Sequence, residues 1–320
     1  MKREKINGLI AAPFTPMKGD GSIAYEIIPS YYKLLKQNNV KGVFICGSTG
    51  EGVSLSASEK YLVTEAWASC TKNDPEFKVM LLLGGTSIKE CQDLAIKVSQ
   101  LPIHSISITA PFYFKPVNAK VLAKVCQEIA SVVPELPFYY YHIPVLTGVD
   151  ISMYSLLQEV DGLVPNFAGI KYTHEDFMDF QSCLSYQNGK YDMLWGRDEN
   201  MLSALAVGAT GAVGSTFNYA APLYNRLIEA FQQNDLDNAR TLQLQSIEMI
   251  RLLGKYGGIA TGKAYMKLIG LNCGEFRLPV KNLDSTDYEQ FVNDTGKIGF
   301  NNFCSVLAKN TNEVVTNTSV

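Results

Sequence analysis

Short apolar, β-rich runs recur along the chain, separated by stretches in which apolar residues follow helical spacing. These runs predict eight strands, at residues 9–14, 42–47, 79–85, 105–113, 137–142, 167–172, 191–196 and 211–215. Their starts lie about 30 residues apart, the length of a strand with its connecting helix. Strands that alternate with helices form parallel sheets, so the pattern predicts an α/β fold, a (β/α)₈ TIM barrel.

The pattern changes after the eighth predicted strand. Helical spacing continues at residues 223–232, 236–253, 260–268 and 288–306, without a clear strand between them. We therefore expect a barrel at residues 1–221, a C-terminal helical extension at 222–308 and a polar, disordered tail at 309–320. Two helix starts inside the barrel carry a capping box, Ser56-x-x-Glu59 and Ser87-x-x-Glu90.

Composition narrows the class of protein. The 320 residues are 47% apolar and 18% charged with a net charge of −3, which excludes global disorder and a general attraction to nucleic acid. No apolar run approaches the ~20 residues that span a bilayer. The seven cysteines are scattered without a CxxC pair, which favours a reduced, cytoplasmic compartment. We expect a small-molecule partner, and neither nucleic acid nor membrane.

Reactive side chains gather where the predicted strands end. Active sites of this barrel class lie at the carboxyl ends of the strands. The hydroxyl, amine and carboxyl groups at these ends belong to Ser48, Thr49, Tyr113, Tyr141, Lys171, Thr173, Asp198, Glu199 and Ser215. The three histidines are dispersed and no metal-ligand spacing occurs, so no metal site is predicted.

Lys171 is the most informative of these residues. Alternation along its strand places Gly169, Lys171 and Thr173 on one face and residues 168, 170 and 172 on the other. The apolar side chains of residues 170 and 172 suit the helix-covered outside, so Lys171 would point into the barrel. Burial there lowers a lysine pKa and makes the amine a nucleophile for a carbonyl. On periodicity alone, a lysine that reaches solvent at the strand end is the commoner arrangement.

Two loops add binding groups. The turn Gly47-Ser48-Thr49-Gly50 offers free N–H groups and two hydroxyls, which suit a carboxylate or phosphate. An ordinary Gly-Ser turn is the simpler alternative. The pair Asp198-Glu199 follows the seventh predicted strand and is suited to sugar hydroxyls or cations. The alternative there is a solvated acidic loop.

Four separated segments together resemble the N-acetylneuraminate lyase/dihydrodipicolinate synthase superfamily. They are GSTGE at 47–51, YHIPVLTG at 141–148, GIKYT at 169–173 and GATGAVGST at 208–216, and the likeness runs from about residue 7 to about residue 305. The resemblance implies a class I, Schiff-base aldolase on a barrel with a helical extension. It also implies a homotetramer, no metal or organic cofactor, and a covalent imine on Lys171.

Two features favour the N-acetylneuraminate lyases within this superfamily, and the segments YYYHIP at 139–144 and PFYFKP at 111–116 resemble the animal-type lyases most. Leu146 stands where dihydrodipicolinate synthases carry an arginine, and sialic acid lyases use an acidic pair like Asp198-Glu199. The implied reaction is reversible cleavage of N-acetylneuraminate to N-acetylmannosamine and pyruvate. Arg197 departs from the lyases, which have an apolar or aromatic residue there; it turns outward or alters the pairing of Asp198. A keto-deoxy sugar acid aldolase, a dihydrodipicolinate synthase and a catalytically silent keto-acid-binding barrel remain alternatives.

The resemblance also implies residue roles. Lys171 attacks the keto group and Tyr141 transfers the proton, supported by Thr49 and by Tyr113 from a neighbouring subunit. Ser48 and Thr49 hold the substrate carboxylate. The remaining sugar contacts are assigned to Thr173, Gly196, Asp198, Glu199 and Ser215.

Overall fold

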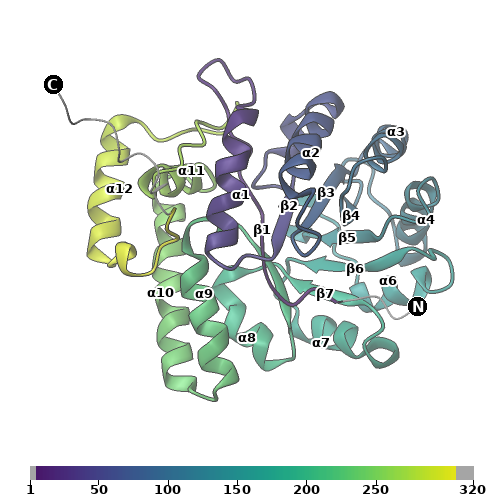
Figure 1. Ribbon diagram of the computed structural model, residues 1–320. Helices are drawn as coiled ribbons and strands as arrows, with labels where there is room; N and C mark the ends of the chain where they lie inside the picture. The colour runs from purple at the N-terminus through teal and green to yellow at the C-terminus, as the bar shows by residue number, and fades with distance from the viewer. Residues whose placement is uncertain (1–4, 308–320) are drawn as a thin grey trace.

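The computed structural model describes residues 5–307. Eight parallel strands pair in chain order and close into a barrel, with β1 hydrogen-bonded to β8 (Figure 1). The strands are β1 (Gly8–Ala11), β2 (Gly42–Ile45), β3 (Lys78–Gly84), β4 (Ser105–Thr109), β5 (Phe138–His142), β6 (Phe167–Tyr172), β7 (Asp192–Trp195) and β8 (Gly211–Gly214). The predicted (β/α)₈ barrel is confirmed.

Helices cover the outside of the barrel. They are α1 (Ile28–Gln37), α2 (Ala57–Thr71), α3 (Ile88–Val98), α4 (Ala119–Ala130), α5 (Pro144–Thr147), α6 (Met153–Val160), α7 (Phe177–Ser185), α8 (Met201–Ala206) and α9 (Phe217–Gln232). The predicted capping box begins α2, where Ser56 and Glu59 exchange side-chain to backbone hydrogen bonds. Ser87 begins α3, and its side-chain hydroxyl accepts a hydrogen bond from the backbone N–H of Glu90.

Several strands end earlier than the sequence predicts. The predicted strand at 9–14 stops at Ala11, and the one at 105–113 stops at Thr109. A proline follows in each case, Pro13 and Pro111. Proline has no N–H to continue the ladder, so the apolar composition extends beyond the pairing. The early ends leave room for loops at the carboxyl end of the barrel.

Two hydrophobic clusters divide the core. The inner one fills the barrel with side chains such as Phe44, Tyr139 and Tyr141, whereas the outer one lies between strands and helices. Ile170 packs in the outer cluster, as alternation predicts. Ala168 was expected outside and instead joins the inner cluster, because the β5–β6 register shifts beside it. A bulge of this kind interrupts strict alternation.

The remaining helices stand beside the barrel, at the left in Figure 1: α10 (Leu236–Lys255), α11 (Ala260–Leu268) and α12 (Ser285–Lys297). The predicted helix at 288–306 ends earlier, since Gly299 adopts a left-handed φ of 66°. The predicted division after residue 221 falls inside α9, which follows β8. The predicted tail at 309–320 lies outside the described residues. Within residues 5–307, no helix is long and apolar enough to cross a membrane.

A buried ion pair ties these helices to the barrel. Lys263 on α11 places its Nζ 2.9 Å from Oε1 of Glu51, which belongs to the loop after β2. Both side chains are under 5% exposed. Lys263 also donates to the carbonyl of Glu275, and Glu51 accepts from the N–H of Arg277. The loop that carries Ser48 and Thr49 is thereby anchored to the C-terminal helices.

Candidate active site

Lys171 points into the barrel from β6. Its side chain is 4% exposed, and its Nζ lies 4.0 Å from the ring centre of Tyr141 and 4.2 Å from that of Phe44. No ion pair in the described part of the chain includes it. Burial lowers the pKa of Lys171 to about 7, while the more distant charge of Asp198 opposes the fall. A substantial share of the amine is therefore neutral and nucleophilic at neutral pH.

Tyr141 lies directly beside this amine. It stands on β5, where it pairs in register with Lys171 on β6. Burial raises the pKa of its phenol, and the hydroxyls of Ser48 and Thr173 counteract part of that rise. Phe44 closes the other side, with its ring 5.4 Å from that of Tyr141. A phenol with two hydroxyl neighbours next to a neutral amine is suited to proton transfer.

The loop after β2 brings polar groups to the same end of the barrel. Ser48 is half-buried and Thr49 is buried. The loop is folded tightly, with the N–H of Gly52 donating to the carbonyl of Gly47. Thr15 donates its hydroxyl to the carbonyl of Gly50 and fixes the turn to the barrel. Ser48 and Tyr141 are thereby placed together, as the pKa of the tyrosine reflects.

Asp198 is buried at the end of β7. Its Oδ2 accepts from the N–H and the hydroxyl of Thr216, at 2.9 and 2.6 Å. The Thr216 hydroxyl in turn lies 2.7 Å from that of Tyr224. Burial raises the pKa of Asp198 to about 7 despite these hydrogen bonds. A substituent on Gly214 would collide with this carboxylate, which explains the glycine.

Arg197 pairs with two glutamates at this end of the barrel. One of its Nη atoms lies 2.7 Å from Oε1 of Glu199 and 2.8 Å from Oε1 of Glu175, so it pairs with these residues rather than with Asp198. Its side chain is 25% exposed, and its Nε is buried without a hydrogen-bond partner among the described residues. The acidic pair is thus divided: Asp198 is tied to Thr216, and Glu199 is tied to a cation.

Three further predicted residues lie at the same end. Gly196 follows β7 and approaches Thr173 so closely that any side chain there would collide with its hydroxyl. The Thr173 hydroxyl is buried and, within residues 5–307, has no partner of good hydrogen-bond geometry. Ser215 follows β8 and is half-buried. These groups are available to a ligand, although Ser215 has no described contact with Lys171.

Tyr113 stands apart from this group. It is 80% exposed in the loop after β4, where its ring packs edge-on against Phe114. No described contact connects it with Lys171 or Tyr141 of the same chain. A role for Tyr113 in catalysis therefore requires the neighbouring subunit that the resemblance implies.

Sequence reasoning missed three contributors to the site. Phe44 is an apolar strand residue, indistinguishable in sequence from other core positions. Thr216 is adjacent to the predicted Ser215, but only the fold shows that it holds Asp198. The partnership of Glu51 with Lys263 joins positions 212 residues apart, and no local pattern signals it. No group of three or more potential metal ligands occurs in the described part of the chain.

Comparison with known proteins places these features in a family. A model of the dihydrodipicolinate synthetase family matches residues 5–297. The chain is 40% identical to N-acetylneuraminate lyase of Rattus norvegicus over 307 residues, which cover 95% of each protein. It is 40% identical to the human N-acetylneuraminate lyase over 283 residues, 87% of this chain and 88% of the human protein. The N-acetylneuraminate lyase structure from Proteus mirabilis superposes with a TM-score of 0.90 at 37% identity, covering 93% of this chain and 100% of that one.

Proposed function

The chain belongs to the dihydrodipicolinate synthetase family, and we propose that it is a Schiff-base aldolase that cleaves N-acetylneuraminate reversibly to N-acetylmannosamine and pyruvate. The observation that carries the proposal is Lys171, a buried amine with a pKa of about 7 and no carboxylate partner. Forty per cent identity to animal N-acetylneuraminate lyases supports the substrate.

The first step is formation of the imine. The open-chain sugar is a 2-keto acid, and its carboxylate is held by the Ser48 and Thr49 hydroxyls and the N–H groups of their turn. The neutral amine of Lys171 attacks C2, and loss of water gives the imine, which is protonated at nitrogen. No metal or organic cofactor takes part in this scheme, because the protonated imine is itself the electron acceptor.

Cleavage then breaks the C3–C4 bond. The bonding electrons move to the imine nitrogen and form an enamine, while the C4 hydroxyl loses its proton and becomes the aldehyde of N-acetylmannosamine. Tyr141 is the acid/base for that proton, since its phenol adjoins the Lys171 amine. Ser48 and Thr173 supply the hydroxyls next to this phenol through which the proton is shared, and the family resemblance adds Thr49. Protonation of the enamine and hydrolysis release pyruvate and restore the amine.

The sugar chain is held at the end of the barrel where β6, β7 and β8 finish. Thr173 offers a buried hydroxyl without a partner of good hydrogen-bond geometry among the described residues, and Gly196 carries no side chain that would block it. Asp198, Glu199 and Ser215 are the proposed partners of the outer hydroxyls. Because Glu199 is paired with Arg197, it accepts these hydroxyls as part of an ion pair.

A homotetramer completes the proposal. The loop after β4 exposes several apolar residues in succession: Phe112, Tyr113, Phe114 and Val117. Exposed apolar groups of this kind are typical of contacts between subunits. Such a contact would bring Tyr113 to the active site of a neighbour, where it supports Tyr141.

The decisive experiment traps the imine. The protein is incubated with N-acetylneuraminate, reduced with borohydride and digested for mass spectrometry. A pyruvate-sized adduct on Lys171, together with free N-acetylmannosamine, is the expected result. An adduct from added pyruvate but not from the sugar would retain the aldolase and reject this substrate. Absence of an adduct with either compound would reject the imine mechanism.

A further inference from the structure

A second pocket lies at the opposite end of the barrel from Lys171. Its walls come from the segments that precede β1, β2, β3 and β4, so it opens at the amino ends of these strands. Its volume is about 390 Å³, large enough for a small metabolite. Nothing in the proposed aldolase reaction uses this end of the barrel.

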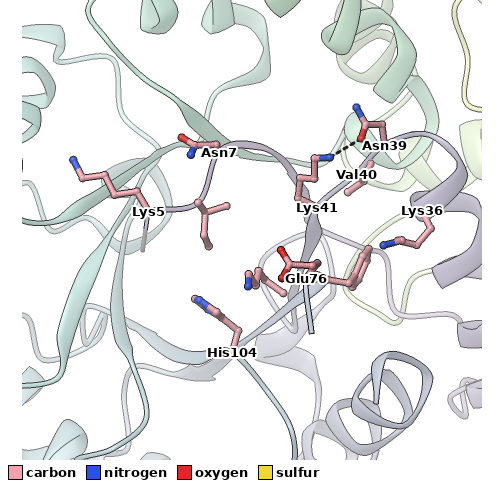
Figure 2. Close-up of a pocket in the computed structure, with 11 residues that line it drawn as sticks. Lys5, Asn7, Lys36, Asn39, Val40, Lys41, Glu76 and His104 are labelled. Atoms are coloured by element: carbon pink, nitrogen blue, oxygen red, sulfur yellow. Dashed lines mark hydrogen bonds between the residues drawn. The ribbon is translucent and has the colours of Figure 1, made fainter. Parts of the chain in front are cut away.

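The pocket is basic in a chain whose net charge is −3. Four lysines line it, Lys5, Lys36, Lys41 and Lys78, against a single carboxylate, Glu76. In Figure 2, Lys5 and Lys36 stand on opposite sides, with Lys41 and Glu76 between them. Lysines brought together from separate segments concentrate positive potential in a concave site and attract anions.

Most of these ammonium groups are not neutralised by carboxylates. Lys41 donates to the side-chain oxygen of Asn39 at 2.6 Å, and Lys78 donates to the carbonyl of Pro75 at 3.2 Å. Both partners are uncharged, so neither hydrogen bond supplies a negative charge to these lysines. Lys36 differs, because it forms an ion pair with Asp74 at 2.6 Å.

His104 adds an unsatisfied polar atom to the same pocket. Its Nδ1 is buried and has no hydrogen-bond partner among the described residues. The residue adjoins Lys78 on the next strand, since the N–H of His104 donates to the carbonyl of Val79. Burial, together with the charge of Lys78, lowers the pKa of His104 to about 4. The imidazole is therefore neutral and able to donate one N–H.

The surroundings of His104 also include acidic groups. Glu76 lines the pocket. Deeper in the barrel, Tyr139 places its ring 6.3 Å from the His104 ring and donates its hydroxyl to Asp192 at 2.9 Å. Burial raises the pKa of Asp192 to about 6, and the charge of Lys5 opposes the rise. Asp192 already accepts hydrogen bonds from the protein. The groups at this end that can still bind a ligand are therefore the lysine side chains and His104.

We propose that this pocket binds a phosphate-bearing small molecule, with the phosphate between Lys41, Lys78 and His104. The backbones of the two lysines are hydrogen-bonded to each other, the N–H of Lys78 to the carbonyl of Lys41 at 2.9 Å, which brings their side chains to neighbouring strands of one rim. A phosphate carries nearly two charges and three acceptor oxygens, and therefore matches the several donors that line this pocket. A monocarboxylate has one charge and matches them less well.

The test uses the full-length protein with inorganic phosphate and pyrophosphate as probes. Binding is measured by calorimetry, and the ring protons of His104 are followed by NMR. The expected result is saturable binding, tightest for pyrophosphate, with an upward shift of the pKa of His104 because a bound anion favours the imidazolium. Acetate, the monovalent comparison, is expected to bind at least about tenfold more weakly.

Variants locate the bound anion. Lys41→Gln and Lys78→Gln are each expected to weaken pyrophosphate binding about threefold to tenfold, and Glu76→Gln is expected to tighten it by a similar factor. Lys89→Gln is the matched control, since Lys89 is an exposed lysine that pairs with Asp93 outside this pocket. It should leave binding unchanged. The pocket variants should keep the basal aldolase activity.

Three results would overturn the proposal. Equal weakening by Lys89→Gln would mean that the anion is attracted only by general surface charge. Unchanged affinity in both Lys41→Gln and Lys78→Gln would place the anion elsewhere, for example in the turn at Ser48. Binding without any response of the His104 protons would also exclude this pocket. None of these measurements uses the sugar reaction, so they stand or fall separately from the proposed aldolase activity.

Discussion

Two lysines are buried to almost the same degree, in two different regions of the molecule. Lys171 lies inside the barrel, and Lys263 lies where α11 meets the loop after β2. Both ammonium groups lie over aromatic rings, and burial lowers the pKa of both. Only Lys263 has a carboxylate within hydrogen-bond distance, that of Glu51. Burial alone therefore does not make a lysine a nucleophile.

The difference lies in what opposes desolvation. The charge and hydrogen bond of Glu51 raise the pKa of Lys263 against the effect of burial, so that lysine stays charged and holds two segments together. Lys171 has only the distant charge of Asp198 to oppose burial, and its pKa falls to about 7. Lys263 therefore stabilises the contact between α11 and the loop after β2. Lys171 has no paired carboxylate and is available for reaction with a carbonyl.

Lys171→Met should have the largest effect on activity. We expect aldol cleavage to fall by at least ~10⁴-fold, because the nucleophile is gone. Folding should be kept or improved by about 1–3 kcal/mol, since an apolar side chain replaces an amine that is costly to bury. Turnover and thermal unfolding of the same preparation measure both. Retention of most activity would exclude the imine.

Lys263→Met should lower the stability of the fold much more than it lowers the activity of the folded protein. It leaves the Glu51 carboxylate buried without its partner, so we expect a loss of about 3–5 kcal/mol in the free energy of unfolding. Molecules that remain folded should still form the imine on Lys171, although the loop that carries Ser48 and Thr49 loses one anchor. Chemical denaturation monitors the loss, and the double variant Lys263→Met/Glu51→Gln serves as the control. That double variant should recover part of the stability, and failure to do so would contradict the pairing as its origin.

Tyr141→Phe tests whether the aromatic neighbour of Lys171 does more than pack. Phe276, the ring beside Lys263, has no hydroxyl, whereas Tyr141 has one. The variant should still form the borohydride-trapped imine but cleave the sugar about 10²–10⁴-fold more slowly. Single-turnover kinetics separate the two steps. If both steps slowed equally, Tyr141 would be a packing residue rather than the acid/base.

The protonation of Lys171 should set the pH dependence of both activity and stability. Lys171 must be neutral to attack, so kcat/KM should rise about tenfold per pH unit below pH 7 and level off above its pKa of about 7. Asp198→Asn removes a charge that favours the ammonium, so the rise should move to lower pH. Because the folded pKa lies below the ordinary value near 10.4, the unfolded state binds more protons between pH 7 and 10. Stability of the parent relative to Lys171→Met should therefore increase with pH across that range.

Arg197 should have the smallest effect, on specificity. Arg197→Gln removes the cation that forms ion pairs with both Glu199 and Glu175. The hydrogen bond between Asp198 and Thr216 is left in place. We expect the preference between sialic acids with full and shortened side chains to change about threefold to tenfold, with little change in imine formation. Competition assays with both sugars measure the ratio. An unchanged ratio would mean that this ion pair does not contact the sugar.

The barrel could be predicted from the sequence alone, and the sequence also nominated the candidate site residues. Strand and helix periods are local properties, so eight βα units were predictable. The inward direction of Lys171 did not follow from periodicity alone, which favours a lysine that reaches solvent, but from the family resemblance of GIKYT at 169–173. Active sites of this barrel class lie at one end of the strands, which brought Ser48, Tyr141 and Asp198 onto the same rim. The same logic failed at Ala168, because a register shift between two strands is not written in either strand alone.

Which charged groups meet could not be predicted before the chain was folded. Glu51 and Lys263 are 212 residues apart in the sequence, and Arg197 had several carboxylates within reach of its flexible side chain. Their pairing depends on how distant segments pack, and so does the presence of Lys41, Lys78 and His104 in one pocket at the amino end of the barrel. The pKa of a lysine follows from burial and from charges in space. That is why the sequence could nominate Lys171, while the fold was needed to distinguish it from Lys263.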